Sequence, residues 1–242
     1  MSKARGADKL PVVVRWLAVQ ADDPAAPAWR DLIDGEEQAR ADRFRFAADR
    51  LAYMAAHALL RRMLADIGGL EPNHWRFQTE PGGRPVLDPA HAQLDLFFSI
   101  SHTRGMVACA VARRAALGVD VEGLARTTPV LEIAHRYFAA SEAAWLASLA
   151  PAEQPGAFIR LWTLKEAYVK ATGRGLAEPL DAFALSLDPP AIHFPSHDGD
   201  PSVWRFAEHQ PSADHRLGLA VRSPEPGSLA LDAGAITDSS LS

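Results

Sequence analysis

The feature that most restricts the possible folds is an order of elements that occurs twice along the chain. In each half, a β-branched strand is followed by short helices, one long helix and about three strands. The two long helices share a local echo, with RLAY at 50–53 and KEAY at 165–168. The order predicts two similar α+β halves with a sheltered cleft between them.

Hydrophobic spacing and turn residues predict the bounds of these elements. Apolar side chains three and four apart predict a long helix at 46–67, which Gly68 and Gly69 end. The other expected helices are 36–41, 130–137, 141–149 and 157–171, and the expected strands are 12–18, 75–79, 94–100, 106–112, 116–121, 183–187, 203–207 and 217–222.

The predicted organisation is an N-terminal lobe at 1–114 and a C-terminal lobe at 115–222, each a long helix packed on a small, mainly antiparallel sheet. The segment formed by residues 1–10 is short and polar. Residues 223–242 are rich in Ser, Gly, Pro and Asp, and we expect them to form a flexible tail.

Composition excludes several classes of protein. With 242 residues, 48% of them apolar, the chain can bury a substantial core. The net charge of −5 argues against a broad nucleic-acid or anionic-membrane surface. The single cysteine, Cys109, cannot form an internal disulfide, and no apolar run of ~18 residues predicts a membrane span. We expect a cytoplasmic protein without a signal peptide.

Two acidic residues share one face of the strand predicted at 116–121. Because alternate residues of a strand point the same way, Asp120 and Glu122 project together while Val119 and Val121 face a core. Paired carboxylates repel each other unless one is protonated or a cation binds, and their hard oxygens suit Mg²⁺. The alternative is an edge strand with a solvated acidic face.

A second candidate site, which contains one acidic residue, lies on the long helix predicted in the second half. Trp162, Glu166 and Lys170 are spaced by four residues and share a helix face. The carboxylate of Glu166, sheltered by the aromatic ring, favours a metal or a charge partner. The alternative is an ordinary surface ion pair between Glu166 and Lys170, which contributes ~0.3–0.5 kcal/mol.

A third signal, Ser101 and His102, lies where a strand ends before Gly105. Both side chains can hydrogen-bond an anionic ligand, and the alternative is a turn with a capping serine. Basic residues able to meet an anion are Arg40, Arg43, Arg50, Arg61, Arg62, Arg84 and Lys170. Most of these are expected to be solvated, with Arg61 and Arg62 exposed on their helix.

Together these segments resemble the 4′-phosphopantetheinyl transferases, in particular the larger, two-lobed, Sfp-like type. GVDVE at 118–122 and WTLKEAYVK at 162–170 match the two family signatures in order and approximate spacing. FAASE at 138–142, GRP at 83–85 and ISH at 100–102 fit the same pattern. The resemblance extends from about Glu36 to Ala220.

The resemblance implies a pseudo-twofold pair of α+β lobes with coenzyme A (CoA) between them. The implied reaction transfers the phosphopantetheine arm of CoA to a serine of an apo acyl, peptidyl or aryl carrier protein and releases adenosine 3′,5′-bisphosphate. The implied cofactor is Mg²⁺, with Mn²⁺ as a substitute. The implied enzyme is a monomer whose partners are CoA and the carrier, with no nucleic acid and no membrane.

The resemblance also implies roles for individual residues. Asp120, Glu122 and Glu166 look like the Mg²⁺ ligands, with Asp120, Glu166 and Lys170 as the catalytic set and Glu166 as the base. The implied CoA contacts are Arg40, Arg84, Ser101, His102 and Lys170, with His102 near the 3′-phosphate. Glu37 and Ala52 stand where members often carry basic or polar residues, which leaves the phosphate contacts there open. The alternatives are an Mg²⁺-dependent phosphoanhydride or phosphodiester hydrolase and a non-catalytic CoA-binding or carrier-binding module.

Overall fold

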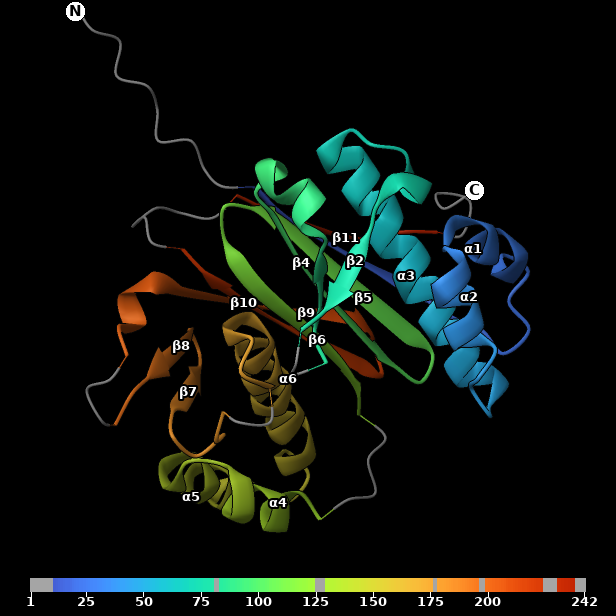
Figure 1. Ribbon diagram of the computed structural model, residues 1–242. Coiled ribbons are helices and arrows are strands. Elements are labelled where there is room, and N and C mark those ends of the chain that lie inside the picture. Colours follow the sequence, from blue (N-terminus) through green and yellow to red (C-terminus); the bar gives the residue numbers. More distant parts are fainter. Residues whose placement is uncertain are drawn as a thin grey trace, which may run out of the picture.

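The computed structural model describes residues 11–80, 83–124, 129–175, 178–195, 199–223 and 230–237 (Figure 1). The first half comprises β1 (Pro11–Ala18), α1 (Ala26–Leu32), α2 (Gly35–Ala41), α3 (Ala47–Gly68), β2 (Phe77–Thr79), β3 (Pro85–Leu87), β4 (Leu96–Thr103) and β5 (Met106–Arg113). The second comprises β6 (Ala116–Gly123), α4 (Val130–Tyr137), α5 (Ala140–Ser148), α6 (Gln154–Thr172), β7 (Ala184–Leu187), β8 (Pro190–His193), β9 (Trp204–Ser212) and β10 (His215–Arg222), and β11 (Ala230–Ala235) follows.

The sheets repeat as the elements do. Strands β1, β5 and β4 are hydrogen-bonded in that order in the first half, and β6, β10 and β9 take the corresponding places in the second. All of these pairings are antiparallel, and each half adds a short hairpin, β2–β3 or β7–β8. This confirms the predicted α+β fold of two similar units. The predicted boundary at residue 114 falls between β5 and β6, and the division into lobes stays a prediction.

Alternating side chains make β5 an interior strand with two different faces. Val107, Cys109 and Val111 pack with α3 in one core cluster. Ala108 and Ala110 point the other way, into a cluster shared with β1, β6 and β10. The two larger sheets therefore pack on each other through small and branched side chains. The long helices cover their outer faces, with the sheets between α3 and α6 (Figure 1).

The long helices end where the sequence predicts, because a glycine follows each of them. Gly69 after α3 and Gly173 after α6 adopt left-handed backbone angles, with φ of 78° and 73°. Glycine takes this conformation without the steric penalty of a Cβ atom, which makes it the usual residue after a helix.

Several sequence predictions are corrected. The tail predicted at 223–242 contains β11, which pairs in parallel with β1 and is fixed by an ion pair between Arg15 and Asp232 at 2.7 Å. Residues 224–229 and 238–242 lie outside the described residues, as do 1–10. Helix α1 was not expected, and Arg61, expected to be exposed, is fully buried.

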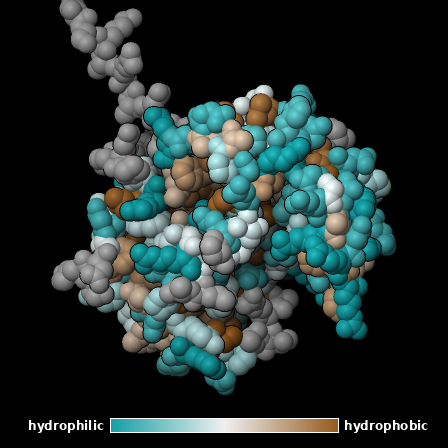
Figure 2. Space-filling model, in the orientation of Figure 1, coloured by the Kyte–Doolittle hydropathy of each residue, from teal (hydrophilic) through white to brown (hydrophobic). Residues whose placement is uncertain are grey.

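The surface agrees with the charged composition. Hydrophilic residues predominate over α1 and α2, and hydrophobic residues form small separate patches on the face shown in Figure 2. Among the described residues, no helix has the length and apolar content needed to cross a membrane.

Candidate functional site

Strand β6 places two carboxylates on the side of the sheet that faces α6. Val119 and Val121 are buried between the two sheets, so the alternate residues Asp120 and Glu122 point the other way. Asp120 is buried, with 6% of its surface exposed. The predicted shared face of these two residues is therefore present, and it lies against a helix rather than in open solvent.

Helix α6 lies in main-chain contact with this sheet because two glycines leave room for it. A Cβ atom on Gly118 would lie 2.0 Å from the carbonyl oxygen of Ala167, and one on Gly218 would lie 2.6 Å from the carbonyl carbon of Thr163. This close approach brings Lys170 onto β6. Its Nζ lies 2.8 Å from Oδ1 of Asp120 and donates to the carbonyl oxygen of Val119 at 3.0 Å.

A row of hydroxyl side chains on β4 contacts the edge of β6 that no strand pairs with in its own sheet. Ser99 Oγ accepts a hydrogen bond from Val119 N at 3.1 Å. Ser101 Oγ accepts from Val121 N at 3.3 Å and donates to Oδ1 of Asp120 at 2.8 Å. These side chains satisfy main-chain donors that no neighbouring strand pairs. The hydrogen bonds of Ser101 thus fix the position of Asp120.

The row continues with Thr103, whose Oγ1 donates to Oε2 of Glu122 at 3.4 Å. Of the residues in this row, the sequence predicted only Ser101 as a site residue. The signal that would have revealed the rest is the period of two in Ser99, Ser101 and Thr103, which puts all three hydroxyls on one face of the strand.

The second oxygen of Asp120 is the unusual atom of the site. Oδ2 is buried and has no hydrogen-bond partner among the described residues. A buried carboxylate oxygen without a partner is costly, and a bound cation would satisfy it. In the parts of the chain that the structure describes, no three His, Cys, Asp or Glu side chains lie close enough together to hold a metal ion as they stand.

A cleft of about 730 Å³ opens beside these residues and is lined by both halves of the chain. Glu166 and Lys170 line it from α6, together with Trp162, as their shared helix face predicts. Across the cleft lie Phe98, Ser99 and Ile100 of β4, with Gly83, Arg84 and Pro85; Tyr137, Val169 and the segment around Gly173–Leu180 complete the lining. The sheltered space between the halves is thus where the element repeat predicts it.

Arg84 reaches from the first half to the end of α6. A Cβ atom on Gly173 would lie 2.8 Å from Nη1 of Arg84, so the guanidinium group rests against the C-terminus of the helix. The partial negative charge of a helix C-terminus favours a cation there. Arg84 therefore lines the cleft from the first half, as Lys170 does from α6.

His102 and Arg40 do not line the cleft. His102 is exposed one residue before the end of β4, and partial desolvation together with the charges of Lys170 and His57 lowers its pKa. Arg40 lies over the ring of Tyr53, 5.7 Å from its centre. These two residues belong to a neighbouring region between α2, α3 and the end of β4.

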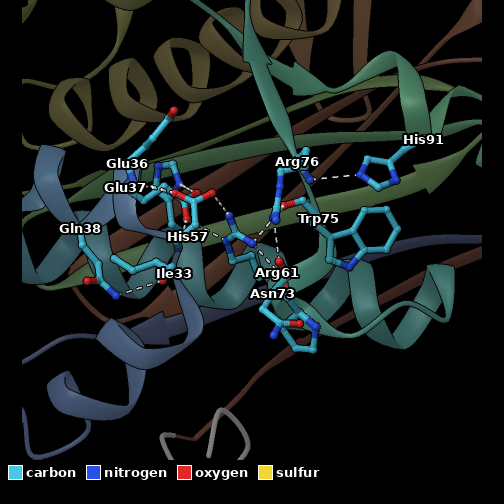
Figure 3. A network of polar contacts seen from close by, with 12 residues as sticks. Ile33, Glu36, Glu37, Gln38, His57, Arg61, Asn73, Trp75, Arg76 and His91 are labelled. Carbon is cyan, nitrogen blue, oxygen red and sulfur yellow. Dashed lines mark hydrogen bonds and ion pairs between the residues drawn. The ribbon is translucent and has the colours of Figure 1, made fainter.

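That region contains a polar network which the sequence did not reveal (Figure 3). Arg61 donates from Nε to Glu37 Oε2 at 2.8 Å and from Nη2 to Asp34 Oδ2 at 2.6 Å. Glu37 also lies 2.8 Å from Nδ1 of His57 and completes the capping box of α2 with Asp34. Burial by itself would raise the pKa of Glu37, but the hydrogen bond and charge of His57 and the charge of Arg61 lower it overall.

Comparison with known proteins identifies the family. The model of the 4′-phosphopantetheinyl transferase superfamily matches residues 116–220, and that of the 4′-phosphopantetheinyl transferase N-terminal region matches 22–114. The chain is 36% identical to 4′-phosphopantetheinyl transferase HetI of Nostoc sp. over 78% of each chain. It is 31% identical to 4′-phosphopantetheinyl transferase Sfp of Bacillus subtilis over 74% of each chain.

A human relative is similar over much of its length as well. L-aminoadipate-semialdehyde dehydrogenase-phosphopantetheinyl transferase of Homo sapiens is 30% identical over 80% of this chain and 68% of its own. Together with the two family matches, which between them cover most of both halves, these relatives confirm the resemblance inferred from the signatures. The chain belongs to the 4′-phosphopantetheinyl transferase superfamily and is a transferase.

Proposed function

We propose that this protein transfers the 4′-phosphopantetheine arm of CoA to a serine of an apo carrier protein and releases adenosine 3′,5′-bisphosphate. The observation that carries the proposal is the ion pair between Lys170 of α6 and Asp120 of β6, beside a cleft between the two halves that Glu166 and Lys170 line. A carrier serine would meet the CoA diphosphate at this point.

The reaction forms one bond and breaks one. The serine oxygen attacks the phosphorus that carries the pantetheine arm, and the anhydride oxygen leaves with the adenosine bisphosphate. Glu166 accepts the proton of the serine hydroxyl, since serine is a weak nucleophile when protonated. Lys170 donates to the leaving phosphate, where negative charge develops.

Asp120, Glu122 and Glu166 would hold the Mg²⁺ ion of the proposed enzyme. The partnerless Oδ2 of Asp120 supports this assignment, as does the hard-oxygen chemistry of the three side chains. When bound, the ion supplies charge neutralisation at the diphosphate. The hydrogen bonds from Ser101 and Lys170 hold Asp120 in one orientation, so that its free oxygen faces away from both donors.

The cleft and Arg84 would bind the substrate. The apolar side chains of Phe98, Ile100 and Trp162 exclude water from the reacting phosphate, which strengthens every charge interaction there. Arg84 would meet a phosphate of CoA across the cleft from Lys170. A monomeric, cytoplasmic enzyme stays a prediction from the sequence.

The experiment is mass spectrometry of apo acyl, peptidyl and aryl carrier proteins after incubation with CoA, Mg²⁺ and this protein. We expect one carrier to gain the mass of a phosphopantetheine group, and Asp120→Asn and Glu166→Gln to abolish the gain. Asp66→Asn is the matched control, because Asp66 is an exposed carboxylate on α3. No gain on any carrier would contradict the proposal, and adenosine bisphosphate released without a carrier would indicate a hydrolase.

A further inference from the structure

The hydroxyl row on β4 meets β6 in a pattern that repeats every two residues. The main-chain nitrogens that donate to Ser99 and Ser101 belong to Val119 and Val121, each 20 residues further along the chain. Because this offset is the same at both positions, β4 and β6 run side by side in the same direction and in a fixed register. Each hydroxyl of the row therefore faces an equivalent position on β6.

The same register sets each carboxylate of β6 against its own hydroxyl. Ser101 Oγ donates to Oδ1 of Asp120 at 2.8 Å, and Thr103 Oγ1 donates to Oε2 of Glu122 at 3.4 Å. Both contacts join residues 19 apart in the chain, so the second is the first repeated two residues further on. The contact of Thr103 with Glu122 thus follows from the register of the two strands.

The three hydroxyls nevertheless have different partners. Ser99 contacts only the main chain of β6, and Ser101 contacts both the main chain and Asp120. Among the described residues, Thr103 forms its single side-chain hydrogen bond with Glu122. Removing the Thr103 hydroxyl would therefore leave every main-chain donor of β6 with its partner. A change at this position affects the direction of a carboxylate separately from the pairing of the strand.

Thr103 is itself fixed from two sides through the turn that follows it. The carbonyl oxygen of Arg104 accepts from Nε2 of His215 at 3.1 Å, and that of Gly105 accepts from the main-chain nitrogen of Val19 at 3.0 Å. His215 begins β10, the strand that pairs with β6. The end of β4 is thus held to the strand beside the carboxylates, which keeps the hydroxyl in reach of its acceptor.

The two carboxylates need such donors to keep one arrangement. Asp120 and Glu122 are two residues apart on one strand face, with Cα atoms ~7 Å from each other, and their charges repel. A hydroxyl donor stabilises the charged oxygen and gives the side chain a preferred direction. Ser101 and Lys170 supply donors to Asp120, and Thr103 supplies the corresponding donor to Glu122.

We propose that Thr103 positions Glu122 for a small divalent cation and thereby favours Mg²⁺ over Ca²⁺ at this site. The inference rests on the metal site of the proposed function. Mg²⁺ demands a nearly ideal octahedral arrangement of oxygens, whereas Ca²⁺ accepts more ligands in a flexible arrangement. A carboxylate with a fixed direction therefore benefits Mg²⁺ more than Ca²⁺.

The test measures metal binding rather than turnover. Mn²⁺ bound to the protein in the presence of CoA is followed by electron paramagnetic resonance, with CoA and Mn²⁺ without protein as the blank, and is displaced by Mg²⁺ or by Ca²⁺. We expect Thr103→Val to raise the Kd for Mg²⁺ roughly tenfold, because loss of a hydrogen-bond partner of a metal ligand costs about that much or more. The Kd for Ca²⁺ should rise less than about twofold.

Conservative and matched variants separate positioning from folding. Thr103→Ser keeps a hydroxyl and should keep most of the preference for Mg²⁺, whereas Thr103→Ala, which lacks it, should repeat the loss. Thr79→Val replaces an exposed threonine on β2 and should change neither constant. An unchanged Kd for Mg²⁺ in Thr103→Val and Thr103→Ala, or equal rises for both ions, would overturn the inference.

Metal binding and transfer can fail separately, which distinguishes this inference from the proposed function. If the variants lose their preference for Mg²⁺ as expected while no carrier gains mass, the transferase proposal fails and the positioning of Glu122 is supported. If a carrier gains mass but the unaltered protein binds no Mn²⁺, or binds Mg²⁺ no more tightly than Ca²⁺, the inference is refuted and the proposed function stands.

Discussion

Replacing Lys165 with methionine tests how much one buried ion pair stabilises the segments that line the cleft near Leu180. The Lys165 side chain is fully buried, and its Nζ lies 2.8 Å from Oε2 of Glu142. It also donates to the carbonyl oxygens of Leu180 at 2.7 Å and Phe183 at 2.9 Å. Glu142 accepts in turn from the main-chain nitrogen of Leu185 at 2.8 Å. One ammonium group thus joins α5, α6 and the segment before β7.

Lys165→Met leaves the Glu142 carboxylate buried without its cation. Removing one partner of a buried ion pair typically costs ~3–5 kcal/mol of unfolding free energy. For a chain of this size, 1 kcal/mol corresponds to roughly 2–4 °C, so we expect Tm to fall by roughly 6–20 °C. The assay is denaturant unfolding, in which the midpoint should fall while the m value stays the same, and thermal melting supports it.

The pH dependence of this variant follows from the same burial. Burial raises the pKa of Glu142 above its ordinary 4.5 and lowers that of Lys165. With the lysine gone, the folded state favours the neutral carboxyl. A group whose pKa is raised in the folded state contributes stability below its ordinary pKa, and this contribution is lost as pH rises. The loss caused by Lys165→Met should therefore be smaller near pH 4 than at pH 7.

Two controls make the prediction decisive. Combining Lys165→Met with Glu142→Gln removes the stranded charge but keeps the hydrogen-bond acceptor, and should recover much of the loss. Arg62→Met breaks an exposed pair with Asp66 at 3.6 Å and should cost less than about 1 kcal/mol. A loss below about 1 kcal/mol in Lys165→Met itself would refute the reasoning.

Three further outcomes are expected. Gly118→Ala forces α6 away from β6, so it should lower the unfolding free energy by ~1–3 kcal/mol and reduce transfer sharply. Gly156→Ala is the control and should do neither, because its added Cβ would meet no atom within 4 Å. Ser101→Ala removes a donor from Asp120 and should cost ~1–3 kcal/mol in denaturant unfolding with slower transfer; unchanged kcat would contradict its role. The lowered pKa of Glu37 means that its stabilisation is present above pH 4.5 and is lost as pH falls below it, so Glu37→Gln should be destabilised at pH 7 and approach the unaltered protein in acid.

Much of the fold followed from local patterns in the sequence. The period of two at Val119, Asp120 and Val121 depends only on strand geometry, so it predicted correctly which side chains face the core. Helical spacing likewise placed Glu166 and Lys170 on the face that lines the cleft. Repetition of these patterns was enough to predict two halves of the same topology, because each element is specified by its own residues.

The partners of these residues depended on tertiary structure. Nothing local indicates that Ser101 contacts Asp120, that Glu37 holds His57, or that β11 returns to pair with β1. Each contact joins segments far apart in the chain, and which segments meet is decided by the packing of two sheets and two long helices. Sequence periodicity determined which way side chains point, and close packing decided what they touch.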